Sequence, residues 1–298
     1  MKKIAITGLS GAIGTRFMKN LPVGFEFYDL YHTHKASSEQ VINKHIELLD
    51  PKNILKCLEE VSPDMIIHMA AITHIDRCEE DRKYGKEGSV WKVNVGASDA
   101  ISKYCKKNHT KLIFLSTECV FDGEEPLYEE KSSKNPKNWY GRTKSEAEDI
   151  IRTNFPEASI IRAVIAYHEN DLEKTLFGKL LQSLKDKKSF GAVTDQIITP
   201  TYTDDIIKSI SLLIQKPQSG IFHISPDSKT TIYDLAFKLA NKFGFDDSLI
   251  VGQTLEEYFG EDRAKLRLKN SCLRGEQTKS KLGFAPLTID DVLDKIKL

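Results

Sequence analysis

Six short apolar runs, rich in β-branched side chains, recur along the chain with little polar alternation inside them. Runs of this kind are typical of parallel strands that are covered on both faces of a sheet. We therefore expect strands at residues 3–7, 25–30, 64–69, 111–116, 159–164 and 220–224.

Helical patterns lie between these runs. Apolar residues spaced three or four positions apart predict helices at residues 51–61, 89–107, 140–154 and 231–243. Pro51 suits a first helical turn, and Thr231 and Asp234 form a capping pattern. Strands that alternate with helices predict right-handed βαβ units, and so a doubly wound parallel sheet.

A glycine-rich turn follows the first expected strand and opens a helix. Gly8 permits a tight turn, Gly11 lets a pyrophosphate approach the backbone, and Gly14 allows close packing of helix on strand. Backbone N–H groups at the start of such a helix hold phosphates. The spacing G-x-x-G-x-x-G differs from the commoner G-x-G-x-x-G, but its place between strand and helix predicts a dinucleotide site.

These patterns predict an α/β fold with a doubly wound parallel sheet of the Rossmann type and a smaller C-terminal lobe. The alternation is regular to about residue 165 and looser afterwards, where residues 244–250 and 257–270 read as surface connections. We expect a dinucleotide-binding domain at 1–165 and a substrate-binding lobe at 166–298, with 198–225 returning to the first domain. The charged stretch 122–137 is expected to be a loop, either plain surface or a flap beside a site.

The end of the second expected strand carries conflicting signals about the cofactor. Asp29 is placed to accept hydrogen bonds from an adenosine ribose, which favours NAD. His32, His34 and Lys35 follow and could neutralise a 2′-phosphate, which favours NADP. The sequence leaves NAD and NADP equally open.

A threonine, a tyrosine and a lysine form the candidate catalytic group. Thr117 ends the fourth expected strand, at the edge where open α/β sheets bind ligands. Tyr140 begins a helix, and Lys144 lies one turn later on the same helical face. Alone, a Tyr-x-x-x-Lys pair is more often an exposed helix pair, but the glycine turn and Thr117 favour the catalytic interpretation.

Such a group suits the reduction of a ketone. A hydride that reaches the carbonyl carbon leaves negative charge on oxygen, and Tyr140 could supply the proton. The Lys144 ammonium would lower the phenol pKa from its ordinary ~10. Thr117 would hydrogen-bond the substrate oxygen.

The composition of the chain limits which binding partners and which cellular location we expect. The chain has 298 residues, with 43 Lys and Arg against 43 Asp and Glu, so neither nucleic acid nor an anionic membrane is an expected partner. Five scattered cysteines without a C-x-x-C pair predict no disulfide scaffold and no metal site, and fit a reducing, cytoplasmic location. No apolar run is long enough to span a bilayer or to form a signal segment.

Taken together, these features resemble the extended short-chain dehydrogenase/reductase superfamily. More narrowly, they resemble the dTDP-4-dehydrorhamnose reductase family. The narrower resemblance rests on blocks that follow the family's order and span nearly the whole chain: residues 62–81, 116–123, 135–148, 194–206, 220–225 and 267–273.

The resemblance implies a role for each matching residue. Thr117, Tyr140 and Lys144 would be catalytic. The cofactor, NADP or NAD, would contact Gly8, Ser10, Gly11, Ala12, Ile13, Gly14, Glu47, Leu48, Ala70, Ala71, Tyr140 and Lys144, with Asp29 and His32 from the second strand. The substrate would contact Thr73, Glu118, Cys119, Thr199, Pro200 and Thr201. Asn94 matches an asparagine that supports such sites, and it is equally compatible with an ordinary helix residue.

Two pairs of residues depart from the family's usual sequence. Glu118 and Cys119 replace an Asp and a Tyr that faces substrate, and Ala163-Val164 replace Thr-Ser after Arg162. These changes leave the particular sugar open. Nothing basic is patterned beside Cys119, so a redox nucleophile is not expected there.

We therefore expect an NAD(P)H-dependent reductase of a 4-keto-6-deoxy nucleotide sugar. A nucleotide-sugar epimerase is a close alternative, whereas a dehydratase would need an Asp-Glu pair where this chain has Glu118-Cys119. The other alternative is a non-catalytic NADP-binding regulatory subunit that resembles that of methionine adenosyltransferase. The sequence leaves the nucleotide base, the sugar, the stereochemistry at C4 and the oligomeric state open, a homodimer included.

Overall fold

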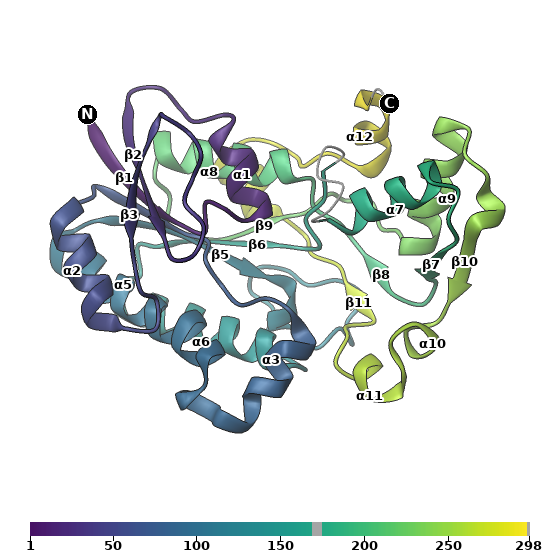
Figure 1. Ribbon diagram of the computed structural model, residues 1–298, viewed down its shortest axis with the longest axis horizontal. Coiled ribbons are helices and arrows are strands. Elements are labelled where there is room, and N and C mark those ends of the chain that lie inside the picture. Colours follow the sequence, from purple (N-terminus) through teal and green to yellow (C-terminus); the bar gives the residue numbers. More distant parts are fainter. Residues whose placement is uncertain (169–174, 297–298) are drawn as a thin grey trace.

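The structure is a computed structural model that describes residues 1–168 and 175–296. Its centre is a seven-stranded parallel sheet in the order β3-β2-β1-β4-β5-β6-β9 (Figure 1). The strands are β1 (Lys2–Thr7), β2 (Phe25–Tyr31), β3 (Val41–His45), β4 (Met65–His68), β5 (Lys111–Thr117), β6 (Ser159–Ala163) and β9 (Gly220–Ile224). The strand order reverses beside β1, which confirms the predicted doubly wound α/β fold.

Helices cover both faces of this sheet, as the continuously apolar strands require. Ala5 of β1 packs in one core with α2 (Pro51–Val61), α5 (Ala97–Asn108) and α6 (Trp139–Asn154). Ile4 and Ile6 point to the opposite core, which α1 (Ala12–Met18) and α8 (Thr203–Gln215) cover. Side chains of a strand alternate between its two faces, so β1 supplies both cores.

All six expected strands are confirmed, and one further strand of this sheet was missed. β3 pairs with β2 at the edge of the sheet, and its Ile42, Lys44 and His45 are exposed. A short edge strand of this kind lacks the apolar run by which the others were found. Thr117 consequently ends the fifth strand of the chain and not the fourth.

The four expected helices are also confirmed, with one correction inside the stretch 89–107. The helix there is interrupted by a π-helical turn at Lys92–Gly96, which joins α4 (Ser89–Trp91) to α5. The helix α3 (Ile75–Asp81) precedes this segment. Turns of this kind widen a helix locally and are frequent at functional sites.

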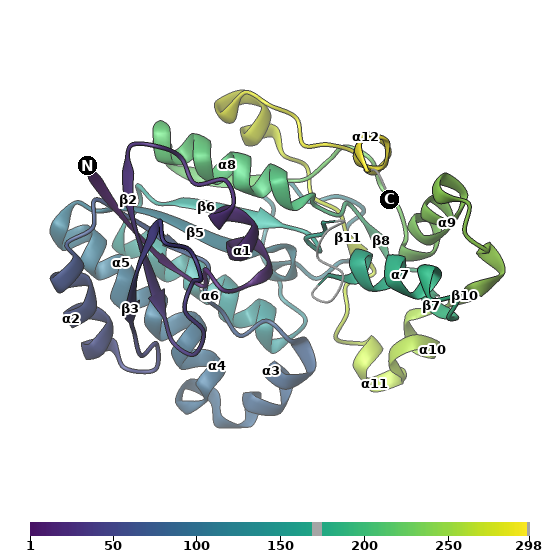
Figure 2. The same cartoon turned by 45° about the horizontal axis from the view of Figure 1, so that its top comes forward.

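The second part of the chain packs around its own apolar core beyond the carboxyl ends of the main strands (Figures 1 and 2). Residues 244–250 and 257–270, expected as plain connections, contain part of its regular structure. Its elements are α7 (Leu176–Lys185), β7 (Phe190–Val193), β8 (Ile197–Ile198), α9 (Ile232–Phe243), β10 (Ile250–Gln253), α10 (Leu255–Phe259), α11 (Glu261–Ala264), β11 (Asn270–Ser271) and α12 (Ile289–Lys295). The division of the chain at residue 165 stays a prediction.

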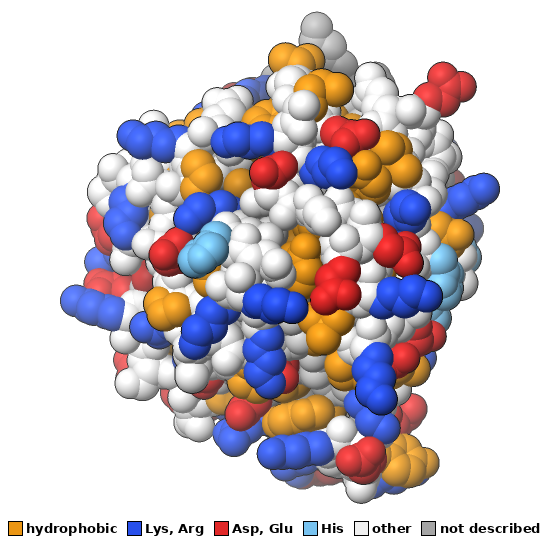
Figure 3. Space-filling model, turned by 90° about the vertical axis from the view of Figure 1, so that its left-hand side faces the viewer, with side chains coloured by type: hydrophobic (Ala, Val, Ile, Leu, Met, Phe, Trp, Pro, Cys, Tyr) orange, Lys and Arg blue, Asp and Glu red, His pale blue; other side chains and the backbone are white. Residues whose placement is uncertain are grey.

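The surface shows charges of both signs. On the face nearest β3 and α2, Lys and Arg side chains stand among Asp and Glu, with small hydrophobic areas between them (Figure 3). In the described part of the chain, no helix combines the length and the apolar character that crossing a bilayer demands.

Candidate active site

The glycine turn lies flat against the end of β4. Gly8 has a φ of +80°, and a Cβ there would stand 2.6 Å from the backbone nitrogen of Ala70. A Cβ on Gly14 would stand 2.4 Å from the Leu9 carbonyl oxygen. Gly11 is exposed on the outside of the turn. The first and third glycines are therefore required by packing, and the middle one leaves open backbone, as the cradle of a pyrophosphate requires.

A buried chain of hydrogen bonds runs from this turn toward the helices. Ser98 donates its proton to the Asn94 carbonyl oxygen at 2.7 Å, so its oxygen accepts from His68 Nε2 at 3.2 Å. His68 Nδ1 then accepts from the Thr7 hydroxyl at 2.7 Å. Burial, with a smaller effect from Lys144, lowers the pKa of His68 to about 3. A single neutral tautomer of His68 therefore satisfies the whole chain.

Asn94 links the predicted cofactor channel to α6, the helix that carries Tyr140. Its Oδ1 accepts from the Ile72 N–H at 2.8 Å. Its Nδ2 donates to the Ile72 carbonyl and to the Thr143 hydroxyl, both at 3.0 Å. The residue lies in the π-helical turn and is fully buried. Asn94 therefore fixes the backbone after Ala70 and Ala71 against α6, a supporting role that the sequence left undecided.

Thr117, Glu118, Cys119 and Tyr140 come together at the end of β5. The Thr117 hydroxyl donates to Glu118 Oε2 at 2.7 Å and accepts from the Cys119 N–H at 3.2 Å. The partly buried Tyr140 lies close to this group, since Thr117, Glu118 and Cys119 all act on the pKa of its phenol. Gly141 lets α6 approach this closely, because a Cβ there would lie 2.0 Å from the Cys119 carbonyl oxygen.

The electrostatics of Tyr140 differ from the expectation. Burial, followed by the charges of Cys119 and Glu118, raises the pKa of Tyr140 well above its ordinary value, and Lys144 does not contribute. The prediction that Lys144 lowers this pKa is wrong for the protein as it stands. The reason is that the hydroxyl faces an acidic residue and two thiols, Cys119 and Cys78, and not the ammonium.

Lys144 points into the sheet. Its Nζ donates to the Leu115 carbonyl oxygen at 2.7 Å and lies 3.9 Å from the centre of the Phe114 ring. Burial lowers its pKa to about 7, against an opposing effect of Glu148. The Lys144 ammonium thus lies beside Leu115, two residues before Thr117 on β5. It loses its proton more readily than an ordinary lysine does.

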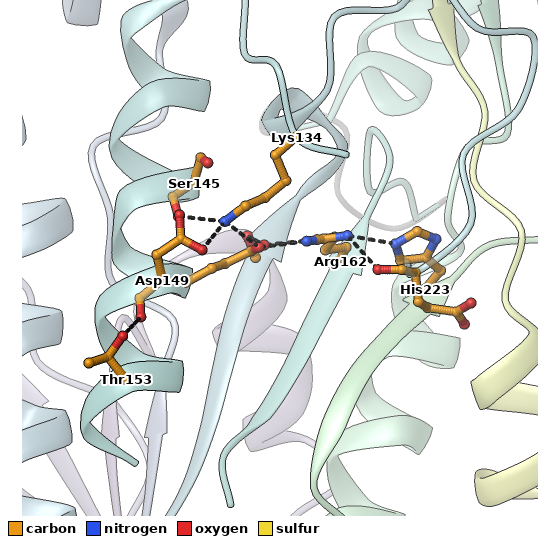
Figure 4. A network of polar contacts seen from close by, with 9 residues as sticks. Lys134, Ser145, Asp149, Thr153, Arg162 and His223 are labelled. Carbon is orange, nitrogen blue, oxygen red and sulfur yellow. Dashed lines mark hydrogen bonds and ion pairs between the residues drawn. The ribbon is translucent and has the colours of Figure 1, made fainter. Parts of the chain in front are cut away.

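A buried ion network anchors the far side of α6 (Figure 4). Glu148, one turn after Lys144, accepts from Arg162 Nε at 2.8 Å and from the Ser116 hydroxyl at 2.6 Å. Arg162 Nη1 also meets His223 Nε2 at 3.2 Å. Burial, followed by the Arg162 charge, lowers the pKa of His223 to about 3, so His223 is a neutral acceptor here. The network joins α6 to β5, β6 and β9.

The residues predicted to contact the adenosine differ in their exposure to solvent. Asp29 is 1% exposed, and its Oδ2 accepts from the Ala36 N–H at 2.7 Å. Burial raises the pKa of this carboxyl. The other carboxylate oxygen, Oδ1, is buried and has no hydrogen-bond partner in the described part of the chain, and the role of Asp29 toward a ribose stays a prediction. His32 is exposed and bonded to Glu47 at 3.1 Å, and Leu48 beside it is buried.

The predicted substrate contacts in the lobe are engaged in internal bonds. The Thr199 hydroxyl accepts from Ser225 at 2.6 Å, and the Thr201 hydroxyl donates to the Ile224 carbonyl at 2.6 Å. Pro200 is buried between them. Thr199 lines a cavity whose lining, within the described residues, does not include Tyr140. The contribution of this segment to a sugar pocket, like that of the exposed Thr73, stays a prediction.

Three groups that shape the site were not singled out in the sequence. Asn138 caps α6 through the Gly141 N–H at 2.7 Å and donates to the Leu266 carbonyl of the lobe at 2.9 Å. The sequence could have indicated Asn138, since Asn is a preferred N-cap residue and Asn138 stands just before the expected helix. Glu148 follows Tyr140 by two turns on one face. His68 gave no signal, because its run reads as an apolar strand.

The chain is similar to a known protein family and to several known proteins. The sequence profile described as the RmlD substrate binding domain matches residues 1–296. The chain belongs to this family. The profile spans both the glycine turn and the lobe, so the RmlD substrate binding domain family accounts for the whole described chain.

Individual RmlD-type relatives differ in what they do. The chain is 27% identical to a probable low-salt glycan biosynthesis reductase of Haloferax volcanii, over 97% of this chain and 95% of the relative. It is 31% identical to methionine adenosyltransferase 2 subunit beta of Xenopus tropicalis, over 83% of this chain and 74% of the relative. The fold matches a dTDP-4-dehydrorhamnose reductase of Bacillus anthracis solved with NADP, with a TM-score of 0.82, 21% identity and coverage of 99% and 98%.

Proposed function

We propose that the protein is an NAD(P)H-dependent reductase that converts the C4 ketone of a 4-keto-6-deoxy nucleotide sugar to an alcohol. The observation that carries the proposal is the close approach of α6 to the carboxyl end of β5 at Gly141, which brings Tyr140 to the strand end that carries Thr117. Ligands of open α/β sheets bind at this edge. The reductase from Haloferax volcanii and the NADP complex from Bacillus anthracis support the reaction class and the cofactor.

The residues of the glycine turn fit a dinucleotide. A Cβ on Gly8 or Gly14 would collide with neighbouring backbone, so only glycine permits the tight turn in which a pyrophosphate can bind. Gly8, Ser10, Gly11 and the first turn of α1 would hold the pyrophosphate, and Ala70 and Ala71 would border the nicotinamide end. When bound, the nicotinamide ring supplies the hydride.

Tyr140 then acts as the proton donor. Its raised pKa keeps the phenol protonated at neutral pH, so the proton is present before the ketone oxygen becomes basic. Thr117 holds the substrate oxygen beside the phenol. Lys144, fixed on the Leu115 carbonyl, supplies a positive charge one helical turn from Tyr140 and would hold a cofactor ribose hydroxyl.

The test is consumption of NADPH and NADH, followed at 340 nm, with a panel of 4-keto-6-deoxy nucleotide sugars. Tyr140→Phe should lower kcat by about 10²–10⁴-fold, since it removes a general acid, while the cofactor Kd stays within about threefold. Tyr84→Phe, at an exposed tyrosine remote from β5, should retain the wild-type rate. An epimerase would instead change the substrate without net oxidation of the cofactor.

A second candidate is a cofactor-binding regulatory subunit, which the 31% identity to methionine adenosyltransferase 2 subunit beta favours. The site supports it in one respect: Lys144 is engaged with a backbone carbonyl and not with Tyr140. This candidate predicts tight NADP binding, no turnover of any sugar in the panel, and co-purification with an adenosyltransferase. Turnover that Tyr140→Phe abolishes would exclude it.

A further inference from the structure

A line of buried polar side chains joins the glycine turn to α6. Thr7 ends β1 directly before the turn, His68 ends β4, and Ser98 lies in the first turn of α5. Asn94 continues the line from the π-helical turn, and Thr143 completes it from α6. All five residues are at most 1% exposed. Polar groups without access to water must be satisfied by one another or by the backbone.

A backbone carbonyl fixes the direction of the bonds around His68. The Ser98 proton goes to the Asn94 carbonyl oxygen at 2.7 Å, because a carbonyl can only accept. His68 Nε2, 3.2 Å from the Ser98 oxygen, is therefore the protonated nitrogen, and Nδ1 accepts from Thr7 at 2.7 Å. The Thr7 oxygen in turn accepts from the Ala70 N–H at 3.2 Å. Both ring nitrogens of His68 are thus used, one as a donor and one as an acceptor.

The segment after β4 is held at both ends of this line. Ala70 is bonded to the last side chain of β1, and Ile72 is bonded twice to the Asn94 side chain, at 2.8 and 3.0 Å. Asn94 Nδ2 also donates to Thr143, whose hydroxyl donates to the Tyr140 carbonyl oxygen at 2.9 Å. The line therefore connects the backbone of the predicted cofactor channel to the first turn of the helix that carries the predicted proton donor.

We propose that His68 is a positioning residue that sets the distance between the cofactor cradle and Tyr140. The inference rests on the proposed function, in which a hydride and a proton must reach the two atoms of one carbonyl group. The His68 ring bridges the two halves of the line, because it meets Thr7 on one side and Ser98 on the other. Without this bridge the glycine turn and α6 can shift against each other, and a misplacement of about 1 Å can cost on the order of 10²-fold in rate.

The surroundings of His68 suit a role that depends on its hydrogen bonds and not on its charge. Its ring packs on Phe114 of β5, with 5.6 Å between the ring centres and an angle of 36° between the planes. The Lys144 ammonium lies 3.9 Å from the centre of the same Phe114 ring. Burial, followed by the Lys144 charge, lowers the pKa of His68 to about 3. The imidazole is therefore neutral at physiological pH and is held in one tautomer.

The direct test breaks the line at Ser98, in its middle. Ser98→Ala removes the acceptor of His68 Nε2, whereas Ser98→Thr keeps a hydroxyl there. Ser102→Ala is the matched control, because Ser102 lies one turn later in α5 and is equally buried. Its hydroxyl bonds outside the line, to the Asp99 carbonyl oxygen and to Asn154 near the far end of α6.

Two NMR signals report the result without turnover. The whole protein is labelled with ¹⁵N-histidine and ¹³Cζ-tyrosine, and the His68 and Tyr140 signals are assigned by their loss in His68→Leu and Tyr140→Phe. In the wild type at pH 7 the two ring nitrogens of His68 should give widely separated signals, as one fixed neutral tautomer requires. Ser98→Ala should bring these two signals closer together and shift the Tyr140 signal. Ser98→Thr and Ser102→Ala should leave both residues as in the wild type.

The kinetic test uses the same variants with NADPH and a sugar that the panel shows to be turned over. Ser98→Ala should lower kcat by about 10–10²-fold, with the KM for the sugar and the cofactor Kd within about threefold of the wild type. Ser98→Thr should recover kcat, and Ser102→Ala should retain it. A purely structural role would lower the melting temperature but leave kcat per folded molecule unchanged. Circular dichroism confirms folding, and His68→Leu, which removes both ring bonds, carries the test if Ser98→Ala does not fold.

The outcomes separate the two proposals. If no sugar is turned over, but Ser98→Ala shifts the Tyr140 signal and Ser102→Ala does not, the coupling through His68 stands and the reductase assignment fails. If turnover depends on Tyr140, but Ser98→Ala and His68→Leu keep the wild-type kcat and Tyr140 signal, the reductase stands and the role of His68 is overturned.

Discussion

Arg162 of β6 donates two parallel hydrogen bonds to Glu148 of α6, 2.8 Å from Nε to Oε1 and 2.6 Å from Nη2 to Oε2. Both side chains are buried, so neither has water as an alternative partner. Burial of a bidentate ion pair contributes little net stability, but removing one partner leaves an uncompensated charge. The pair is therefore sensitive to single substitutions.

Arg162→Met should lower the free energy of unfolding by about 3–5 kcal/mol, because Glu148 would stay buried without its main partner. Urea denaturation at pH 7 measures this. Arg142→Met is the matched control, since Arg142 and Glu146 form an ion pair of 3.9 Å on the exposed face of α6, the helix that also carries Glu148. Its cost should be below about 1 kcal/mol. Equal costs for the two variants would contradict the buried network.

Lys144 should make stability depend on pH in a specific window. Burial lowers its native pKa to about 7 from the ordinary 10.5. Between these values the unfolded chain binds the extra proton, so the free energy of unfolding rises with pH, by up to about 1.4 kcal/mol per unit. Below pH 7 Lys144 is protonated in both the folded and the unfolded chain. The full free-energy cost of burying its charge then lowers the stability of the folded state.

Lys144→Met removes that dependence. The stability difference between the wild type and Lys144→Met should therefore change steadily between pH 7 and 10 in favour of the wild type, as denaturation at several pH values would show. Parallel pH curves for the two proteins would show that the ammonium is not desolvated in the native state.

The first glycine of the turn should be irreplaceable. Gly8→Ala places a Cβ 2.6 Å from the Ala70 nitrogen at a φ of +80°, so it should cost more than about 1 kcal/mol of stability and weaken NADP binding. Gly96→Ala is the control, because Gly96 has helical backbone and open space around it. It should stabilise by about 0.4–1 kcal/mol. Thermal unfolding and cofactor fluorescence measure both effects.

The exposed histidine after β2 should favour NADP over NAD. Asp29 is turned inward onto the Ala36 amide, whereas His32 is exposed just after β2, where the sequence predicts the adenosine to bind. We expect NADP to bind about tenfold more tightly, which corresponds to about 1.4 kcal/mol. His32→Asp should remove this preference by repelling the 2′-phosphate, and His109→Asp, on an exposed loop elsewhere, should not. Equal Kd values for both cofactors in the wild type would refute the expectation.

Hydrophobic periodicity predicted the buried elements well, for a physical reason. Strands such as β1 lie between two helical layers, so Ile4, Ala5 and Ile6 are apolar on both faces and the run is visible in one dimension. β3 has one neighbour and an open edge, so Asn43 and Lys44 are tolerated and the run disappears. The short helices α10 and α11 likewise carry few buried residues and were read as loops.

The membership of the candidate site stays a prediction, and the electrostatics of Tyr140 differ from the expectation. Spacing places Tyr140 and Lys144 on one helical face, and the strand end brings Thr117 beside them. Spacing does not reveal which side chain turns inward. Lys144 is held by Leu115, and Tyr140 faces Glu118, because the close approach at Gly141 sets the height of α6 over β5. That relation depends on tertiary packing, which no local pattern encodes.

The place of β9 beside β6 has a consequence for synthesis of the chain. On the ribosome, β6 emerges long before β9, since α7, β7 and α8 are translated between them. Until residues 220–224 leave the exit tunnel, the nascent sheet presents the unpaired backbone of β6, which other strands can join. Co-translational chaperones should therefore be needed most while ribosomes translate this interval, and a stalled chain that ends inside it should aggregate.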